Sequence, residues 1–135
     1  MGVKLRIDPK FKNLVNAFSA EHLNQYLTAV GDLELSKTRQ RFRNQVDPDF
    51  NPWKITIRKI LDPSAKILRK SGNLFNSTAR QVAGKSVYIG TNLSYAVFHQ
   101  DGTDKIPQRR IFGINNQTQK SIEQAFNTIM GKILK

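Results

Sequence analysis

The C-terminal part of the chain carries its clearest hydrophobic pattern. Apolar residues recur there at intervals of three and four, namely Ile122, Ala125, Phe126, Ile129, Met130 and Ile133. This spacing places them on one face of an α-helix, so it predicts an amphipathic helix with one buried side. Asn116 is a suitable N-cap for this helix, and Gln119 follows it at the spacing of a capping box.

The composition allows such a helix to belong to one packed domain. The chain has 135 residues, of which 39% are hydrophobic, and this content argues against disorder. It contains no cysteine, which excludes disulfide bonds and thiolate metal sites. No apolar run approaches the roughly 18 residues that a membrane span needs, so we expect no membrane association.

The first third of the chain predicts a strand followed by a long helix. Residues 3–7 alternate apolar and basic side chains, which suits a short edge strand. Residues 11–46 contain no proline and are expected to be helical, with Gly31 either interrupting the helix or only weakening it. The apolar stripe of this helix consists of Leu14, Phe18, His22, Tyr26 and Val30, continued by Leu35, Phe42 and Val46. The basic side chains of this helix are expected on both sides of the buried apolar stripe.

The middle of the chain alternates turns with short elements. The proline-rich turn at 47–52 precedes Trp53, which we expect to pack this turn onto the body of the domain. Residues 55–61 are ambiguous, and residues 65–77 predict a short helix.

A β-hairpin is predicted next. Two apolar-rich runs flank Gly84-Lys85, and a glycine at the first position of a two-residue loop is typical of a type II′ turn. A short helix at 94–100, capped by Ser94 or Asn92, and a strand or extended segment at 111–114 follow.

These elements predict a single α+β domain spanning residues 1–135. We expect an antiparallel sheet with a hairpin, packed by the long N-terminal helix, short helices and the C-terminal helix. Within it, residues 1–10 form a strand or arm, 11–46 are helical, and 65–135 form the α+β core.

The positive charge is concentrated in the middle of the sequence. The formal net charge is +12, and the segment from Lys37 to Lys85 holds 12 basic and three acidic residues, which leaves +9 there. Such a segment favours contact with a polyanion or with an acidic protein surface. A basic nucleic-acid-binding module is therefore one hypothesis, although no recognition motif accompanies the charge.

The residues that could support catalysis are sparse. Residues 84–86, Gly-Lys-Ser, match the end of a phosphate-binding loop, but Ala79 stands where that motif needs its first glycine and a strand is expected to follow. His22 and His99 are the only histidines and lack the spacing of a zinc site. We therefore expect no enzyme, no cofactor and no metal.

The second half contains several motifs in a defined order. Residues 67–74 read I-L-x-x-S-G-x-L, residues 90–92 read G-T-N, residues 95–102 read Y-A-x-x-H-Q-x-G, and residues 106–113 read I-P-x-R-x-x-x-G. Together with Arg41-Phe42 and the turn before Trp53, this order resembles the phage virion morphogenesis family of contractile-tailed bacteriophages, over about residues 20–134.

The resemblance implies a structural protein of the virion, present in the host cytoplasm before assembly. It would complete the tail or join tail to head through contacts with other neck, tail or head proteins. It would act as a homo-oligomer, for which a ring is one arrangement. The basic segment would then make nonspecific contact with DNA in the neck lumen.

The same resemblance marks particular residues as structural. These motif residues are Trp53, Gly72, Gly90, Asn92, Tyr95, Ala96, His99, Gln100, Gly102, Pro107, Arg109 and Gly113. We expect Tyr95, Phe98 and His99 to pack against the hairpin, and His99 and Gln100 to hydrogen-bond backbone in the turn that leads to the loop with Pro107 and Arg109. They would thereby support a polar contact loop at 103–110. The candidate interaction residues are Arg39, Arg41, Arg43, Arg109 and Arg110.

Overall fold

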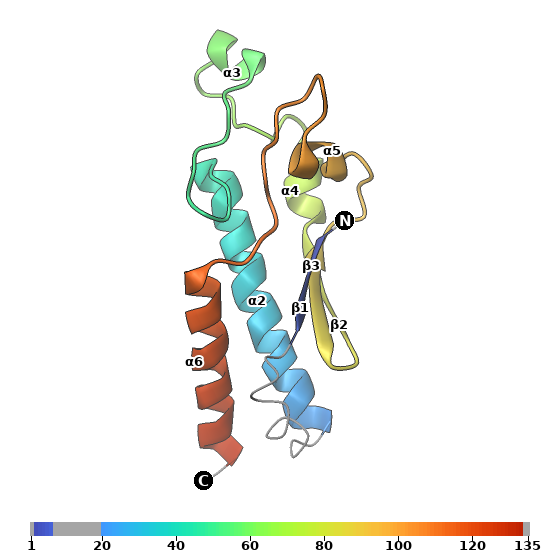
Figure 1. The fold of residues 1–135 in the computed structure, drawn as a ribbon, viewed down its shortest axis with the longest axis vertical. Helices are drawn as coiled ribbons and strands as arrows, with labels where there is room; N and C mark the ends of the chain where they lie inside the picture. Colours follow the sequence, from blue (N-terminus) through green and yellow to red (C-terminus); the bar gives the residue numbers. More distant parts are fainter. Residues whose placement is uncertain (1, 7–19, 134–135) are drawn as a thin grey trace.

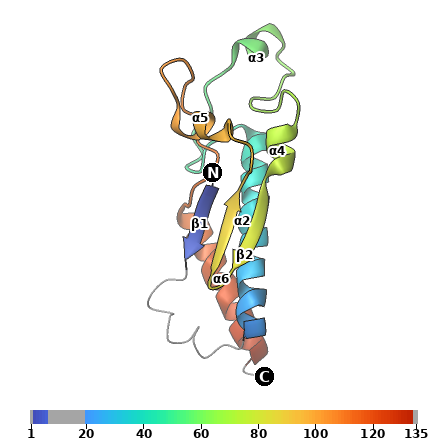
Figure 2. The same ribbon diagram turned by 90° about the vertical axis from the view of Figure 1, so that its right-hand side faces the viewer.

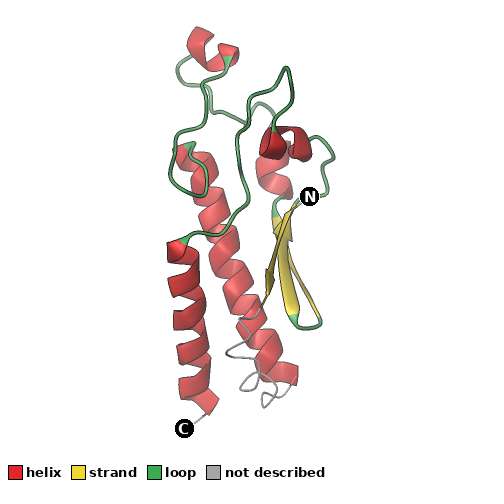
Figure 3. Ribbon diagram, viewed as in Figure 1, coloured by secondary structure: helices red, strands yellow, loops and turns green. Residues whose placement is uncertain are grey.

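The computed structural model describes residues 2–6 and 20–133, and it has an α+β fold, as predicted (Figures 1 and 3). Its elements in chain order are β1 (Gly2–Arg6), α2 (Ala20–Asn44), α3 (Ile57–Leu61), α4 (Asn73–Ser77), β2 (Ala79–Ala83), β3 (Ser86–Gly90), α5 (Ala96–Asp101) and α6 (Asn116–Ile133).

The three strands form one antiparallel sheet in the order β1-β3-β2. β1 is an edge strand, as predicted for residues 3–7, although residue 7 lies outside the described residues. The hairpin is also confirmed, because β2 and β3 are joined by Gly84-Lys85 with a positive φ only at Gly84, as a type II′ turn requires. Val87 and Ile89 are buried while Tyr88 between them is exposed, so one face of β3 lies against the core.

Helix α2 is the central layer, with the sheet on one side and α6 on the other (Figures 1 and 2). Gly31 lies within this helix and does not interrupt it. A Cβ atom at Gly31 would lie 2.8 Å from Arg80 Cδ and 2.9 Å from Val87 Cγ2, so the glycine lets α2 approach the hairpin. On the opposite side, Tyr26 meets Phe126 of α6 edge-on, with ring centroids 5.8 Å apart.

Both long helices were predicted as helices, but their observed ends differ from the predicted ones. α2 ends at Asn44, and the next residue, Gln45, has a φ of 57° that no right-handed helix contains. The start predicted at residue 11 lies outside the described residues, as do Leu14 and Phe18 of the predicted stripe.

Helix α6 buries Ala125, Phe126 and Ile129 on one face, as its pattern predicts. The N-cap prediction was wrong by one residue. The Asn115 side chain, and not that of Asn116, accepts the hydrogen bond from Thr118 N at 2.9 Å. Thr118 therefore occupies the third helical position that was assigned to Gln119.

The helix predicted at 65–77 was wrong over most of its length. Only α4 at its end is helical, and it begins after Gly72, whose φ of 79° belongs to the left-handed region. Leu68 also has a positive φ, of 62°. The capping predicted for α5 was wrong as well, since its N-cap is Tyr95, which makes no side-chain capping bond. The ambiguous residues 55–61 contain α3, at the opposite end of the molecule from the last turn of α6 (Figure 1).

Candidate functional site

Residues 109–113 run from the loop after α5 to the start of α6 as a buried segment that belongs to no sheet (Figure 1). The strand considered for 111–114 is therefore absent, and the chain bends at Phe112. Ile111 is 0% exposed and Phe112 is 2% exposed. Buried amide and carbonyl groups without partners cost free energy, so this stretch needs hydrogen bonds from elsewhere. We call residues 109–113 the clamped segment, because side chains supply most of those bonds.

Gln100, on α5, provides three of the bonds to the clamped segment. Its Oε1 accepts from Ile111 N at 2.8 Å and from Phe112 N at 3.0 Å, and its Nε2 donates to the Phe112 carbonyl at 2.8 Å. One side-chain amide thus substitutes for a neighbouring strand. Gln100 was expected to bond backbone, and it does, but to the backbone after the loop and not to that before it.

Two further side chains complete the clamp. Trp53 is buried against Phe42, with ring centroids 5.6 Å apart, and its Nε1 donates to the Arg110 carbonyl at 2.9 Å. Arg41 Nη1 donates to the Ile111 carbonyl at 3.1 Å, and Nη2 donates to the Gly113 carbonyl at 3.2 Å. The predicted role of Trp53 in fixing the 47–52 turn is thereby extended, since its indole also holds the clamped segment.

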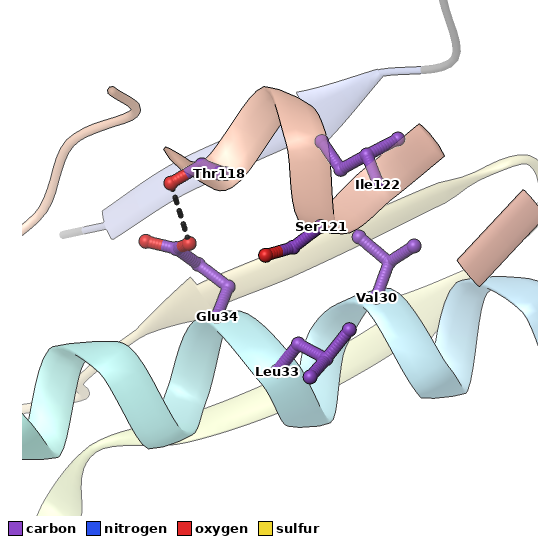
Figure 4. A pocket seen from close by; sticks show the side chains of 6 residues that line it. All are labelled: Val30, Leu33, Glu34, Thr118, Ser121 and Ile122. Carbon is purple, nitrogen blue, oxygen red and sulfur yellow. Dashed lines mark hydrogen bonds between the residues drawn. The ribbon is translucent and has the colours of Figure 1, made fainter. Parts of the chain in front are cut away.

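The Arg41 guanidinium is itself balanced by a buried carboxylate. Arg41 Nη2 lies 3.0 Å from Glu34 Oε1, and both side chains are 5% exposed. Glu34 Oε2 accepts a second hydrogen bond from Thr118 Oγ1 at 3.0 Å, which ties α2 to the first turn of α6 (Figure 4). The pair is thus hydrogen-bonded on both sides, as buried charges must be.

Arg109 and His99 join the clamped segment to its surroundings. The Arg109 amide donates to the His99 carbonyl at 2.7 Å, and Arg109 Nε donates to the Lys54 carbonyl at 2.8 Å. Burial lowers the pKa of Arg109. The pKa of His99 is also lowered, first by burial and then by the charge of Arg109, so the ring favours its neutral form.

The side chain of His99 does not make the backbone bond that was expected of it. Its buried Nδ1 has no hydrogen-bond partner among the described residues. The ring instead meets Tyr95 edge-on, with centroids 6.3 Å apart. Tyr95 is 40% exposed and Phe98 is 49% exposed, and neither belongs to the core that contains Val87 and Ile89 of the hairpin, which corrects the expectation that they pack against the hairpin.

The other motif residues fall into two groups. Gly113 belongs to the clamped segment, Gly102 and Pro107 lie in the loop that leads to it, and Ala96 is buried on α5. A Cβ at Gly102 would lie 3.0 Å from Gln108 N, which explains the glycine in the Y-A-x-x-H-Q-x-G motif. The residues away from this segment are Gly72 before α4, Gly90 at the end of β3, and the exposed Asn92.

The candidate interaction residues do not form one surface. Arg41 and Arg109 are buried, so the basic face predicted for the end of the long helix is incomplete. Arg39 is half-buried and donates to the Thr78 carbonyl. Arg43 is exposed, and Arg110 is half-buried with an ion pair to Asp49 at 3.2 Å.

Sequence reasoning missed the Glu34–Arg41–Thr118 network. A signal for it was present, because Glu34 and Arg41 continue the buried face of Leu27 and Val30 at helical spacing. A charged pair on an apolar stripe is the pattern of a buried ion pair.

The described residues hold no group of three or more acidic or histidine side chains that could bind a metal. The hollow beside Glu34 and Thr118 has no internal room for a water molecule (Figure 4). Within the described ranges, no helix is both long and apolar enough to cross a membrane. The polar motif side chains instead hold backbone, which is the chemistry of a scaffold.

The fold and this site therefore define a small α+β scaffold protein. The model of the phage virion morphogenesis family matches residues 5–131, and the chain belongs to that family. This confirms the resemblance seen in the motifs and extends it to Leu5, within β1. The family has a structural and assembly role in bacteriophages. No curated protein and no solved structure matches the chain.

Proposed function

We propose that this chain completes the phage tail or joins it to the head, as a neck component that acts through protein–protein contacts. The observation that carries the proposal is the clamp. Gln100, Trp53 and Arg41 hold residues 109–113 in place, and the polar loop before that segment projects from the fixed frame. A loop anchored in this way presents a constant shape to a partner at little entropic cost.

The use of the motif side chains also favours a structural role over catalysis. Gln100, Trp53 and Arg109 direct their polar groups at backbone carbonyls and amides, so these groups are not free to bind or activate a substrate. A catalytic group needs a reactive atom that reaches substrate. We therefore propose that the chain has no enzymatic activity.

The proposed partners are other neck, tail or head proteins together with further copies of this chain. A homo-oligomer, with a ring as one arrangement, would match the symmetry of the tail. Light scattering tests this point, because the monomer mass is 15.4 kDa and any ring is several times larger.

Complementation of a phage deleted for this gene tests the proposed function. Asp104 and Lys105 are exposed at the tip of the loop. We expect the variant D104A/K105A to restore fewer plaques than the wild type while melting at the same temperature. The matched control, E123A/N127A on the exposed side of α6, should complement fully. Equal plaque counts for the two variants would remove the loop from the proposal.

Contact with DNA is a second candidate function, favoured by four exposed cations near one end of α2 and beyond it. These are Arg43, Lys54, Lys66 and Lys70. Binding to duplex DNA should weaken with salt, with a log–log slope of about −0.9 per phosphate contacted. A protein that fails to shift duplex DNA at low salt would lack this function.

A further inference from the structure

The segment around α3 exposes an unusual amount of apolar surface. We call residues 54–66 the α3 arm. Ile55, Ile57, Ile60 and Leu61 are 62%, 77%, 68% and 80% exposed, respectively. Ile57, Ile60 and Leu61 stand three and four residues apart, so they share one face of the single helical turn. No residue of α3 is buried.

Several polar side chains of the arm bond to its own backbone and hold its shape. Lys59 Nζ donates to the Pro63 carbonyl at 3.2 Å and to the Ala65 carbonyl at 3.0 Å, and Arg58 donates to the Lys66 carbonyl. Thr56 Oγ1 caps α3 by accepting from Lys59 N at 3.1 Å. This arrangement is the opposite of a hydrophobic core, because polar groups make the contacts that stabilise the arm and its apolar side chains are exposed to solvent.

Both ends of the arm are fixed to the scaffold. At its start, the Lys54 carbonyl accepts the bond from Arg109 Nε at 2.8 Å. At its end, Ala65 is buried, and the next buried residue, Ile67, donates its amide to Gln45 Oε1 at 2.9 Å. The arm projects beyond the end of α2 (Figures 1 and 2). Its apolar face is therefore held in a defined position.

The charge of the arm identifies the kind of surface that would cover this face. Four basic residues, Lys54, Arg58, Lys59 and Lys66, stand against the single acidic residue Asp62, which gives a net charge of +3. The cations that hold the arm bond to neutral carbonyls, so their charge is not cancelled. An acidic rim around an apolar hollow complements such a surface in both respects.

Two other occupants match the arm less well. A second copy of this chain carries the same +12 charge and the same basic arm, so arm-to-arm pairing brings like charges together. Duplex DNA would neutralise the cations but would leave the isoleucine and leucine side chains without an apolar partner.

We propose that the α3 arm inserts its apolar face into an acidic-rimmed apolar hollow of another virion protein. This proposal rests on the proposed function and deepens it by naming the surface and the chemistry of the partner. Contact between the apolar side chains would supply the affinity, and the charges would supply orientation and the rate of encounter.

The test uses heads and tails purified separately from the phage that lacks this chain. Binding of the full-length protein to each is measured by co-sedimentation. The variant I57S/I60S/L61S removes the apolar face and keeps the charge, and L33S/I114S removes two exposed apolar side chains elsewhere as the control. The proposal predicts that the arm variant binds at least about tenfold more weakly, while the control binds like the wild type. The variant K54Q/K66Q should lose part of the salt dependence.

Several results would overturn the proposal. Equal binding by the arm variant and the wild type would show that the arm is not the contact. Arm-dependent self-association, flotation with anionic phospholipid vesicles, or arm-dependent binding to duplex DNA in place of heads and tails would assign the arm to another partner. Absence of wild-type binding to both particles would also reject it. The proposed function has its own readout in the plaque counts of the deletion phage, so the two failures are distinguishable.

Discussion

Gln100 and Phe112 are joined by a pair of reciprocal hydrogen bonds, in which the side-chain amide of Gln100 both donates to and accepts from the Phe112 backbone, at 2.8 Å and 3.0 Å. The pairing has the form of a β-ladder contact, yet a side chain makes it. Phe112 is thereby held in the core although its segment belongs to no sheet. The fixed position of Phe112 in turn positions the polar loop that precedes it and the first turn of α6 that follows it.

Replacement of Gln100 by alanine should therefore destabilise the protein strongly. The change leaves two amides and one carbonyl of the clamped segment without partners, and we expect a loss of about 2–3 kcal/mol in the free energy of unfolding. Urea denaturation followed by circular dichroism measures this. Gln108→Ala is the control, since its side chain makes one exposed bond to the Gln100 carbonyl, and it should change stability by less than about 0.5 kcal/mol. Similar losses for both variants would contradict the clamp.

The buried ion pair gives a second prediction. Arg41→Met leaves the Glu34 carboxylate buried with only Thr118 as a partner, so we expect a loss of about 3–5 kcal/mol. Arg43→Met, on the exposed side of the same helix turn, should cost less than about 0.5 kcal/mol. In a double-mutant cycle, Glu34→Leu combined with Arg41→Met should cost less than the sum of the two single changes, because neither charge is then stranded. An additive cycle would mean that the pair is not coupled.

Two glycines within helices should respond in opposite directions to alanine. At Gly31 the new Cβ would lie 2.8 Å from Arg80 Cδ and 2.9 Å from Val87 Cγ2, and the resulting displacement should cost about 1–3 kcal/mol. At Gly131 nothing lies within 4 Å of the new Cβ, so the higher helix propensity of alanine should stabilise the protein, by up to about 1 kcal/mol. Thermal melting of both variants checks the signs. Stabilisation by Gly31→Ala would refute the close approach of α2 to the hairpin.

The lowered pKa of His99 predicts that the free energy of unfolding depends on pH. Its pKa is lowered from 6.5 in the folded protein, because burial and the charge of Arg109 oppose protonation. The unfolded chain therefore binds the proton more readily, so this contribution to stability is present above pH 6.5 and is lost as the pH falls from there towards the lowered pKa. Unfolding free energies measured across this range should fall less steeply for His99→Gln than for the wild type. Parallel profiles for the two proteins would contradict the shift.

The sequence predicted the elements whose pattern is local. The apolar face of α6, the hairpin around Gly84-Lys85 and the strand β1 follow from periodicities of 3.6 and 2 residues and from turn chemistry, which short-range physics determines. The prediction of a helix at 65–77 was wrong over most of its length. The apolar spacing there is typical of a helix, but Gly72 takes a left-handed conformation and the Ile67 amide bonds to the side chain of Gln45, 22 residues away.

The candidate site was predictable only in part. The motifs identified Gln100 and Trp53 as structural residues, but their partners lie 11 to 57 residues away along the chain, and no local pattern reveals such pairs. Arg41 was placed on the surface because it lies in a basic run. Its burial depends on Glu34, one of few acidic residues on α2, and on carbonyls that reach it only in the folded molecule. The exposure of the apolar side chains of the α3 arm likewise could not be predicted from the sequence, because it depends on which other apolar residues form the core.

We propose that this chain is needed to produce joined particles. Electron microscopy of lysates from a phage deleted for the gene tests it most directly. We expect filled heads and tails to accumulate separately, and to be converted to joined, infectious particles when the wild-type protein is supplied. Complete and infectious particles made without the protein would contradict it.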